Sequence, residues 1–315
     1  KNNGLLSNSS INNVDSNMGI GHVRYPTAGI IDNNEIQPFV YNNFALCHNG
    51  TIHNYNELLE IYKNYDFQLN SKSDSELLFK IFVHEISQYS EINDRNIFKV
   101  IEKISKICKG AYSVIIMIAN YGLICFKDPY GIRPLVLGKN KNSYIISSES
   151  SSISNLDDNP EILKEINAGE IIFLKKNFYN VNKNEILIES FKYCNYIPKP
   201  CIFEWIYIAR EDSIIHNVSV LQSRYKMGEY LAKKILNDGI DLYDIDLIVP
   251  IPDTSRPVAL KISEMLNIPY REAIIKNRYI ARTFIMDNQI KRKKNIKRKL
   301  SLVNEIVYNK NILIV

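Results

Sequence analysis

Residues 44–58, FALCHNGTIHNYNEL, place His48, Asn49 and Gly50 after an apolar run and shortly before an amphipathic segment. Asn-Gly after a buried strand is typical of a hairpin turn, because both residues tolerate positive φ. The same pair could also do chemistry, since an Asn amide and a Gly N–H fixed at the end of a strand are suitable donors to an oxyanion. This segment alone favours the turn, and an oxyanion hole would require a nucleophile elsewhere.

Two charged residues nearby have types that suit an amino-acid substrate. Arg24 ends an apolar strand predicted over 18–25, MGIGHVRY, where its guanidinium could clamp a carboxylate. Ser73 and Glu76 form a predicted capping box, which leaves Asp74 in the first helical turn free to receive an α-ammonium group. An ordinary surface Arg and an ordinary helix cap are the alternative interpretations.

A third candidate lies near the C-terminal end, in VPIPDTSRPVAL at 249–260. The segment follows a predicted buried strand and leads into a helix, where backbone N–H groups can face a phosphate. KNRYIARTF at 276–284 adds Lys276, Arg278 and Arg282 around Tyr279. An exposed basic loop is the alternative for this second segment.

The elements that must position these residues change in character along the chain. Closely spaced strands predict an antiparallel sheet in the first two-thirds, with a hairpin at Asn42-Asn43. A helix is predicted over 73–86 from its capping box and apolar spacing, and another over 94–108. The predicted strands lie at 37–41, 44–48, 111–119, 122–128, 134–138, 143–149 and 169–176.

A domain boundary is predicted around 192–202, KYCNYIPKPCI, which carries two prolines. Beyond it, helices over 219–237 and 257–266 alternate with apolar strands at 246–252 and at the final NILIV. Ser219 and Gln222 form a second predicted capping box. Apolar strands alternating with helices indicate a parallel sheet buried on both faces.

Composition excludes several classes of protein. The 315 residues suffice for two domains, and a net charge of +5 suits anionic small substrates better than nucleic acid. The scattered cysteines indicate a reducing, cytoplasmic location rather than disulfides or a zinc site. Apolar runs are too short to span a membrane. The chain opens with Lys1 and closes on an apolar strand, so we expect both ends to be truncated.

The order Arg24, His48-Asn49-Gly50 and Ser73-Asp74-Ser75-Glu76 resembles the class II glutamine amidotransferase domain. The resemblance implies an α+β N-terminal-nucleophile hydrolase sandwich over 1–195. It also implies that Arg24, Thr27 and Asp74 bind glutamine, and that Asn49 and Gly50 form the oxyanion hole. The nucleophile would be an N-terminal Cys, which does not map onto Lys1; Cys47 lies inside a strand and is predicted to be a packed core residue.

The second half is similar to the amidophosphoribosyltransferase family, on four segments: DPYGIRPLVLG (128–138), CIFEWIYIAREDS (201–213), VPIPDTSRPVAL (249–260) and KNRYIARTFIMDNQ (276–289). This implies part of an α/β type I phosphoribosyltransferase domain over 196–315. The family makes 5-phosphoribosylamine from phosphoribosylpyrophosphate (PRPP), glutamine and water, the first committed step of purine synthesis. Ammonia passes from the first domain to the second. The fragment alone is expected to be inactive.

The same resemblance assigns the remaining site residues. It makes Asp253, Thr254 and Ser255 the pyrophosphate loop, with Ser255 associated with a magnesium site, and Lys276 and Tyr279 PRPP contacts. Further magnesium ligands would follow Val315. An iron–sulfur cluster is not predicted, although Cys201 matches a ligand position in some members. Purine nucleotide inhibitors and homo-oligomers are expected, and the basic run 291–299 is predicted to lie beside a phosphate-rich site rather than to bind nucleic acid.

Two alternatives stay open. One is another class II enzyme, such as a glucosamine-phosphate synthase, against which VPIPDTSRP and KNRYIARTF argue. The other is a non-catalytic remnant that binds nucleotides or partner chains.

Overall fold

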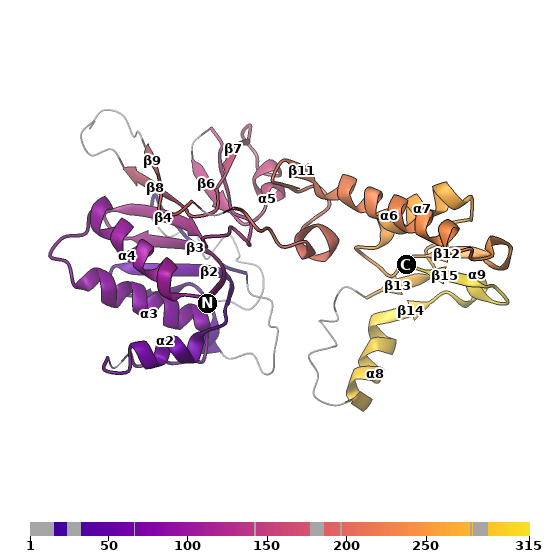
Figure 1. The fold of residues 1–315 in the computed structure, drawn as a ribbon, viewed down its shortest axis with the longest axis horizontal. Coiled ribbons are helices and arrows are strands. Elements are labelled where there is room, and N and C mark those ends of the chain that lie inside the picture. Colours follow the sequence, from indigo (N-terminus) through magenta and orange to yellow (C-terminus); the bar gives the residue numbers. More distant parts are fainter. Residues whose placement is uncertain are drawn as a thin grey trace. The chain divides into compact units, whose positions relative to one another are not determined.

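The computed structural model describes residues 16–23, 33–65, 67–141, 143–176, 186–195, 197–277, 279 and 289–315. They form two compact units, the first ending at Cys201 and the second beginning at Ile202, with Glu149–Ser151 counted with the second (Figure 1). In the described part of the chain, no helix is long and apolar enough to cross a membrane.

The first unit is built on a six-stranded antiparallel sheet with the order β1-β2-β3-β4-β8-β9. A smaller antiparallel sheet has the order β6-β5-β7. The strands are β1 (Phe39–Tyr41), β2 (Phe44–Ile52), β3 (Gly110–Ile118), β4 (Gly122–Lys127), β5 (Val136–Lys139), β6 (Tyr144–Ser147), β7 (Glu161–Glu165), β8 (Glu170–Lys176) and β9 (Ile186–Lys192). The helical segments are η1 (Asn33–Glu35), α2 (Tyr55–Ile61), α3 (Asp74–Ser87), α4 (Asp94–Ile107) and α5 (Ser150–Ser154).

Two apolar clusters cover the two faces of the large sheet. Alternate strand residues point to opposite faces. Leu46 and Val114 share one buried cluster with α3 and α4 side chains, such as Leu78. Cys125 and Ile172 point the other way, into a cluster with Leu137 of the small sheet. The layers are therefore helices, large sheet and small sheet, which confirms the predicted α+β sandwich.

The second unit begins with a short π-helix and continues as strands and helices. Its elements are η2 (Glu204–Ile208), β10 (Ile214–Ile215), β11 (Val218–Ser219), α6 (Val220–Asn237), η3 (Leu242–Asp244), β12 (Leu247–Val249), α7 (Arg256–Leu266), β13 (Ile274–Lys276), α8 (Gln289–Lys299), β14 (Leu300–Leu302), α9 (Asn304–Val307) and β15 (Ile312–Ile314). β12 and β15 pair in parallel, with Leu247 opposite Ile312, as the alternating pattern predicted. Gly228 lets α6 approach α7, since a Cβ there would lie 2.6 Å from the Val258 carbonyl oxygen.

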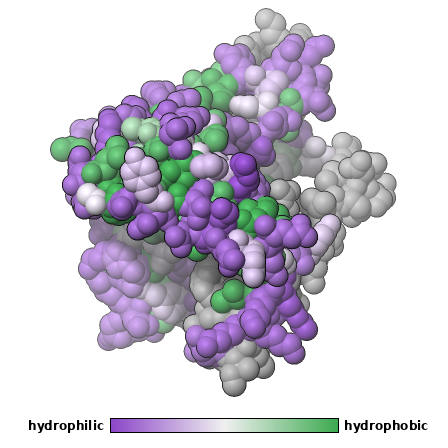
Figure 2. Space-filling model, turned by 90° about the vertical axis from the view of Figure 1, so that its right-hand side faces the viewer, coloured by the Kyte–Doolittle hydropathy of each residue, from purple (hydrophilic) through white to green (hydrophobic). Residues whose placement is uncertain are grey.

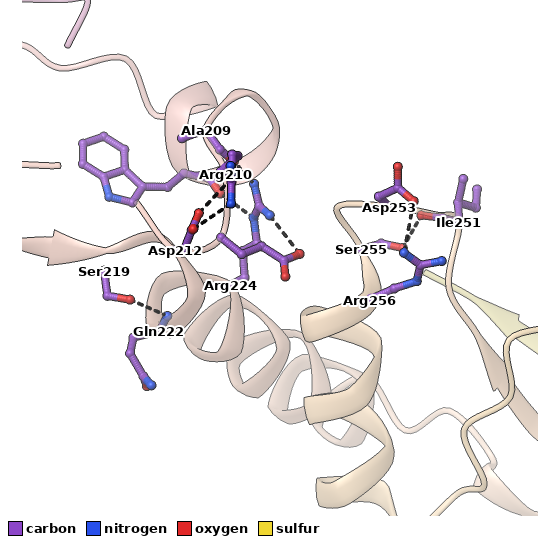
Figure 3. Close-up of polar contacts among 12 residues, drawn as sticks. Ala209, Arg210, Asp212, Ser219, Gln222, Arg224, Ile251, Asp253, Ser255 and Arg256 are labelled. Carbon is purple, nitrogen blue, oxygen red and sulfur yellow. Dashed lines mark hydrogen bonds and ion pairs between the residues drawn. The ribbon is translucent and has the colours of Figure 1, made fainter. Parts of the chain in front are cut away.

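Buried Arg224 of α6 binds the backbone of residues 204–210, EWIYIAR, and so holds this segment against α6. Its guanidinium donates to the backbone oxygens of Trp205 and Ala209 at 2.9 Å and to Glu211 at 3.2 Å (Figure 3). A buried guanidinium needs such partners, because leaving its donors unpaired would be costly.

Three local predictions are wrong. Residues 18–23 are not a strand; 24 and 25 lie outside the described residues. Ser73 does not cap α3 with its side chain, and Glu76, the other member of the predicted box, accepts hydrogen bonds from the backbone N–H groups of Asn70 and Ser71 instead. Asn49-Gly50 is not a turn, because β3 pairs with β2 as far as Ile52.

Other local predictions are confirmed. Asn42 and Asn43 form the hairpin between β1 and β2, where Asn42 has a φ of 49°. Ser219 accepts a hydrogen bond from the Gln222 backbone at the start of α6.

Candidate active site

Asn49 and Gly50 lie next to each other in β2, beyond the residues of this strand that pair with β1. Asn49 is half-buried and Gly50 is exposed. Gly50 has a φ of 147°, and a Cβ at this position would lie 1.9 Å from the Ala111 carbonyl oxygen. Only glycine fits here, because the neighbouring strand leaves no room for a side chain. The pair offers a side-chain amide and a backbone N–H on adjacent residues, as an oxyanion hole requires.

Asp74 begins α3 and is tied to the strand that carries this pair. Its Oδ2 accepts a hydrogen bond from the Ile52 backbone N–H at 2.8 Å. The next residue, Ser75, lies 2.8 Å from Nδ1 of His48 through its hydroxyl. Buried Gln37 accepts from the His48 N–H at 2.6 Å and donates to the His48 carbonyl at 3.1 Å. The network fixes the start of α3 beside β2, so Asp74 has a defined position.

The other glutamine contacts predicted from the sequence, Arg24 and Thr27, lie outside the described residues. Cys47 lies in the core, as predicted, and its burial raises the pKa of its thiol to about 12. A thiol with this pKa stays protonated at neutral pH and is a poor nucleophile. Cys47 therefore does not supply the nucleophile that the oxyanion hole needs.

The buried His48 side chain makes the stability of the first unit depend on pH. Burial, first, and then the charges of His22 and Arg133 lower its pKa to about 4, against an opposing effect of Asp74 and a hydrogen bond with the Ala111 backbone. The unfolded chain therefore binds a proton between pH 6.5 and 4 that the folded chain does not, so stability falls as the pH falls through this window.

We expect the free energy of unfolding to drop by up to about 3 kcal/mol between pH 6.5 and 4 on account of His48. Urea unfolding of wild type and His48→Gln across this range measures the effect, which should shrink in the variant. His53→Gln is the matched control, because His53 is exposed. An equal pH dependence in wild type and His48→Gln would contradict the assignment.

The second candidate site follows β12, at the carboxyl end of a parallel strand, where open α/β sheets bind ligands. Asp253, Ser255 and Arg256 gather there at the start of α7 (Figure 3). The Ser255 hydroxyl donates to the Ile251 carbonyl at 2.7 Å. Asp253 is paired with two cations, Arg256 at 3.0 Å and Lys276 at 2.6 Å. Lys276 thus lies at the predicted pyrophosphate loop, bound to a carboxylate that an anionic ligand could replace.

Thr254 and Ser255 also line a cavity of about 500 Å³ in the second unit. Apolar and aromatic residues form its other walls: Ile206, Tyr207, Met227, Tyr230, Leu231 and Val258. Hydrophobic residues form separate groups among hydrophilic ones on the face shown in Figure 2. Tyr279, the other predicted PRPP contact, is exposed, as are Lys293, Lys294, Lys297 and Arg298 of α8.

The described residues do not by themselves fit a magnesium ion. Among them, no three His, Cys, Asp or Glu side chains gather as metal ligands. The Ser255 hydroxyl is used on Ile251, and Asp253 is neutralised by two cations. The magnesium prediction for Ser255 therefore depends on the resemblance alone.

Comparison with known proteins identifies the relatives of the chain. Residues 22–155 match a family model described as a glutamine amidotransferase domain. Amidophosphoribosyltransferase of Escherichia coli K12 is 38% identical over all of this chain and 63% of its own length. The Saccharomyces cerevisiae enzyme is 35% identical over 99% of this chain and 62% of its own length. This chain is therefore similar in sequence to the amidophosphoribosyltransferases over nearly its whole length.

Solved structures agree with this relationship. Glutamine PRPP amidotransferase from B. subtilis, complexed with ADP and GMP, is 29% identical with a TM-score of 0.73. The match covers 93% of this chain and 59% of that one. The chain thus spans about three-fifths of the length of these relatives and shares their fold over that part.

Proposed function

We propose that the protein carrying this chain is an amidophosphoribosyltransferase, a pentosyltransferase that converts PRPP, glutamine and water to 5-phosphoribosylamine, glutamate and pyrophosphate. One observation carries the proposal: the chain aligns with enzymes of this name over 95–100% of its length, at 35–39% identity. The reaction belongs to de novo purine synthesis, as the words "purine biosynthesis" in the description of a second structural relative suggest.

In the proposed glutaminase step, Asn49 and Gly50 donate hydrogen bonds to the oxyanion that forms when a nucleophile attacks the glutamine amide. Asp74 receives the α-ammonium group and so fixes the substrate. Arg24 and Thr27 are proposed to bind the α-carboxylate side of glutamine. The resemblance implies an N-terminal Cys as the nucleophile.

In the proposed transfer step, the loop at 253–255 and Lys276 bind the pyrophosphate of PRPP. Asp253 forms ion pairs with both Lys276 and Arg256. A pyrophosphate carries more negative charge than one carboxylate, so it can compete for these cations. Tyr279 is proposed as a further PRPP contact. Purine nucleotides as inhibitors, and assembly into a homo-oligomer, stay predictions.

Lys276→Ala in the full-length protein tests the transfer site. We expect PRPP-dependent product formation to fall about 10- to 100-fold, because a charge-assisted contact with the pyrophosphate is lost. The loss should be equal with glutamine and with ammonia as nitrogen source. Measuring pyrophosphate release with each source gives the comparison.

Lys310→Ala is the matched control, since Lys310 also pairs with an Asp, Asp246 at 3.1 Å, in the same unit. A loss confined to the glutamine reaction would contradict a role for Lys276 in binding PRPP. A protein that releases pyrophosphate with neither nitrogen source would contradict the proposed function itself.

A further inference from the structure

The segment Asp128–Pro134 connects β4 to β5 and is built around one buried carboxylate. Asp128 is fully buried and accepts hydrogen bonds from the backbone N–H groups of Tyr112 (3.2 Å), Tyr130 (2.9 Å) and Ile132 (3.0 Å). A buried carboxylate is stable only with such donors. Here the donors come from the segment itself and from β3, so Asp128 fixes the course of the chain that leads to Arg133.

The backbone of this segment is also held from two other sides. Gly131 has a φ of 60°, and a Cβ there would lie 3.0 Å from the Cα and Cβ of Ala168. The Ser113 hydroxyl donates to the Arg133 carbonyl at 3.0 Å. Ser113 is the register partner of Asn49 across β2 and β3. Arg133 is therefore attached to the sheet at the residue next to the candidate oxyanion hole.

The guanidinium of Arg133 completes this connection. Its Nη2 donates to the Asn49 side-chain oxygen at 3.4 Å. An Asn amide can present either its oxygen or its nitrogen to a neighbour, and a guanidinium, which only donates, selects the oxygen. The Asn49 nitrogen is then directed away from Arg133 and is available as a donor.

We propose that Arg133 is a positioning residue for the oxyanion hole. It holds the Asn49 amide with its oxygen toward the Arg133 guanidinium, so that the nitrogen is free to donate to the oxyanion. The inference depends on the proposed glutaminase function and assigns a role within it to the segment DPYGIRP. Arg133 also brings a fixed positive charge to this end of β2, which favours a developing negative charge.

The positive charge of Arg133 acts electrostatically on this part of β2. It is one of the causes, after burial, that lower the pKa of His48. His48 precedes Asn49 in β2, and the side chains of these two neighbours point to opposite faces of the strand.

Arg133→Met and Arg133→Lys in the full-length protein test the role. We expect Arg133→Met to lower kcat for glutamine-dependent glutamate release about 10-fold or more, with less than a threefold change in KM for glutamine. Ammonia-dependent synthesis should be unchanged. Arg133→Lys keeps a donor and should recover part of kcat. Lys139→Met, which removes an exposed cation of β5, is the matched control.

The decisive measurement is a double-mutant cycle with Asn49→Ala. If Arg133 acts through Asn49, Arg133→Met should cost nothing further in the Asn49→Ala background. Additive losses would overturn the proposal, as would a rise in KM at constant kcat, which would make Arg133 a direct glutamine contact. An equal loss of ammonia-dependent activity would indicate a structural role instead.

A wild-type protein that released no glutamate from glutamine would contradict the proposed function but not the positioning role of Arg133. A crystal structure of Arg133→Met would then decide the positioning role separately. A rotated or disordered Asn49 side chain in it would support the role, and an unchanged one would overturn it.

Discussion

Replacing Asn49 with Ala in the full-length protein is expected to lower glutamine-dependent product formation about 10²–10³-fold, because an oxyanion-hole donor contributes on this scale. Ammonia-dependent synthesis should survive, since ammonia requires no amide hydrolysis. Product formation with each nitrogen source, measured side by side, separates the two activities.

Asp74→Asn should give the same pattern, through loss of the proposed contact with the glutamine α-ammonium group. Asn is preferred to Ala at this position because it keeps an acceptor for the Ile52 N–H. Asn56→Ala, on the exposed side of α2, is the matched control and should leave both activities intact. If Asn49→Ala lost both activities equally while the protein stayed folded, the separation of roles between the two units would be wrong.

The second large effect is expected on stability, at Gly50. A Cβ there would lie 1.9 Å from the Ala111 carbonyl oxygen and 2.9 Å from the Tyr112 Cα, both of which belong to the backbone of β3. A backbone cannot move aside as a flexible side chain can, and a φ of 147° adds strain for any residue with a Cβ. Gly50→Ala should therefore lower the free energy of unfolding of the first unit by about 4 kcal/mol or more.

Urea unfolding measures this loss, and hydrogen exchange of peptides from β2 and β3 should locate it. Gly239→Ala is the matched control, because Gly239 has a positive φ of 70° but nothing within 4 Å of an added Cβ. This variant gives the cost of a left-handed backbone conformation, in the second unit, where no steric clash is added. Similar losses in the two variants would show that the contact with Ala111 does not dominate.

Local patterns predicted most of the secondary structure near the site. The sequence predicted α4, α6 and α7 to within one residue at each end, and the Asn-Asn pair predicted the β1–β2 hairpin. Helix periodicity and turn residues act over a few positions, so they can be read from short segments. The order of Arg24, Asn49-Gly50 and Asp74 carried the resemblance to class II glutamine amidotransferases, and that resemblance implied glutamine chemistry.

Contacts between distant segments decided the rest. Asn49-Gly50 became part of a strand rather than a turn because β3, about sixty residues later, continues the pairing past it. Ser73 and Glu76 do not cap α3 as a local motif would, since Glu76 binds the loop before the helix and Asp74 binds Ile52 of β2. Backbone donors are satisfied by whichever acceptor the fold brings near, and spacing along the chain does not specify it.

Arg133 shows most clearly that spacing along the chain does not specify such contacts. Its contact with Asn49 joins residues 84 positions apart. The sequence by itself determined which side chains could form an oxyanion hole. Only the tertiary structure decided which way the Asn49 amide is held, because this orientation depends on the guanidinium of Arg133, which lies in the connection between β4 and β5.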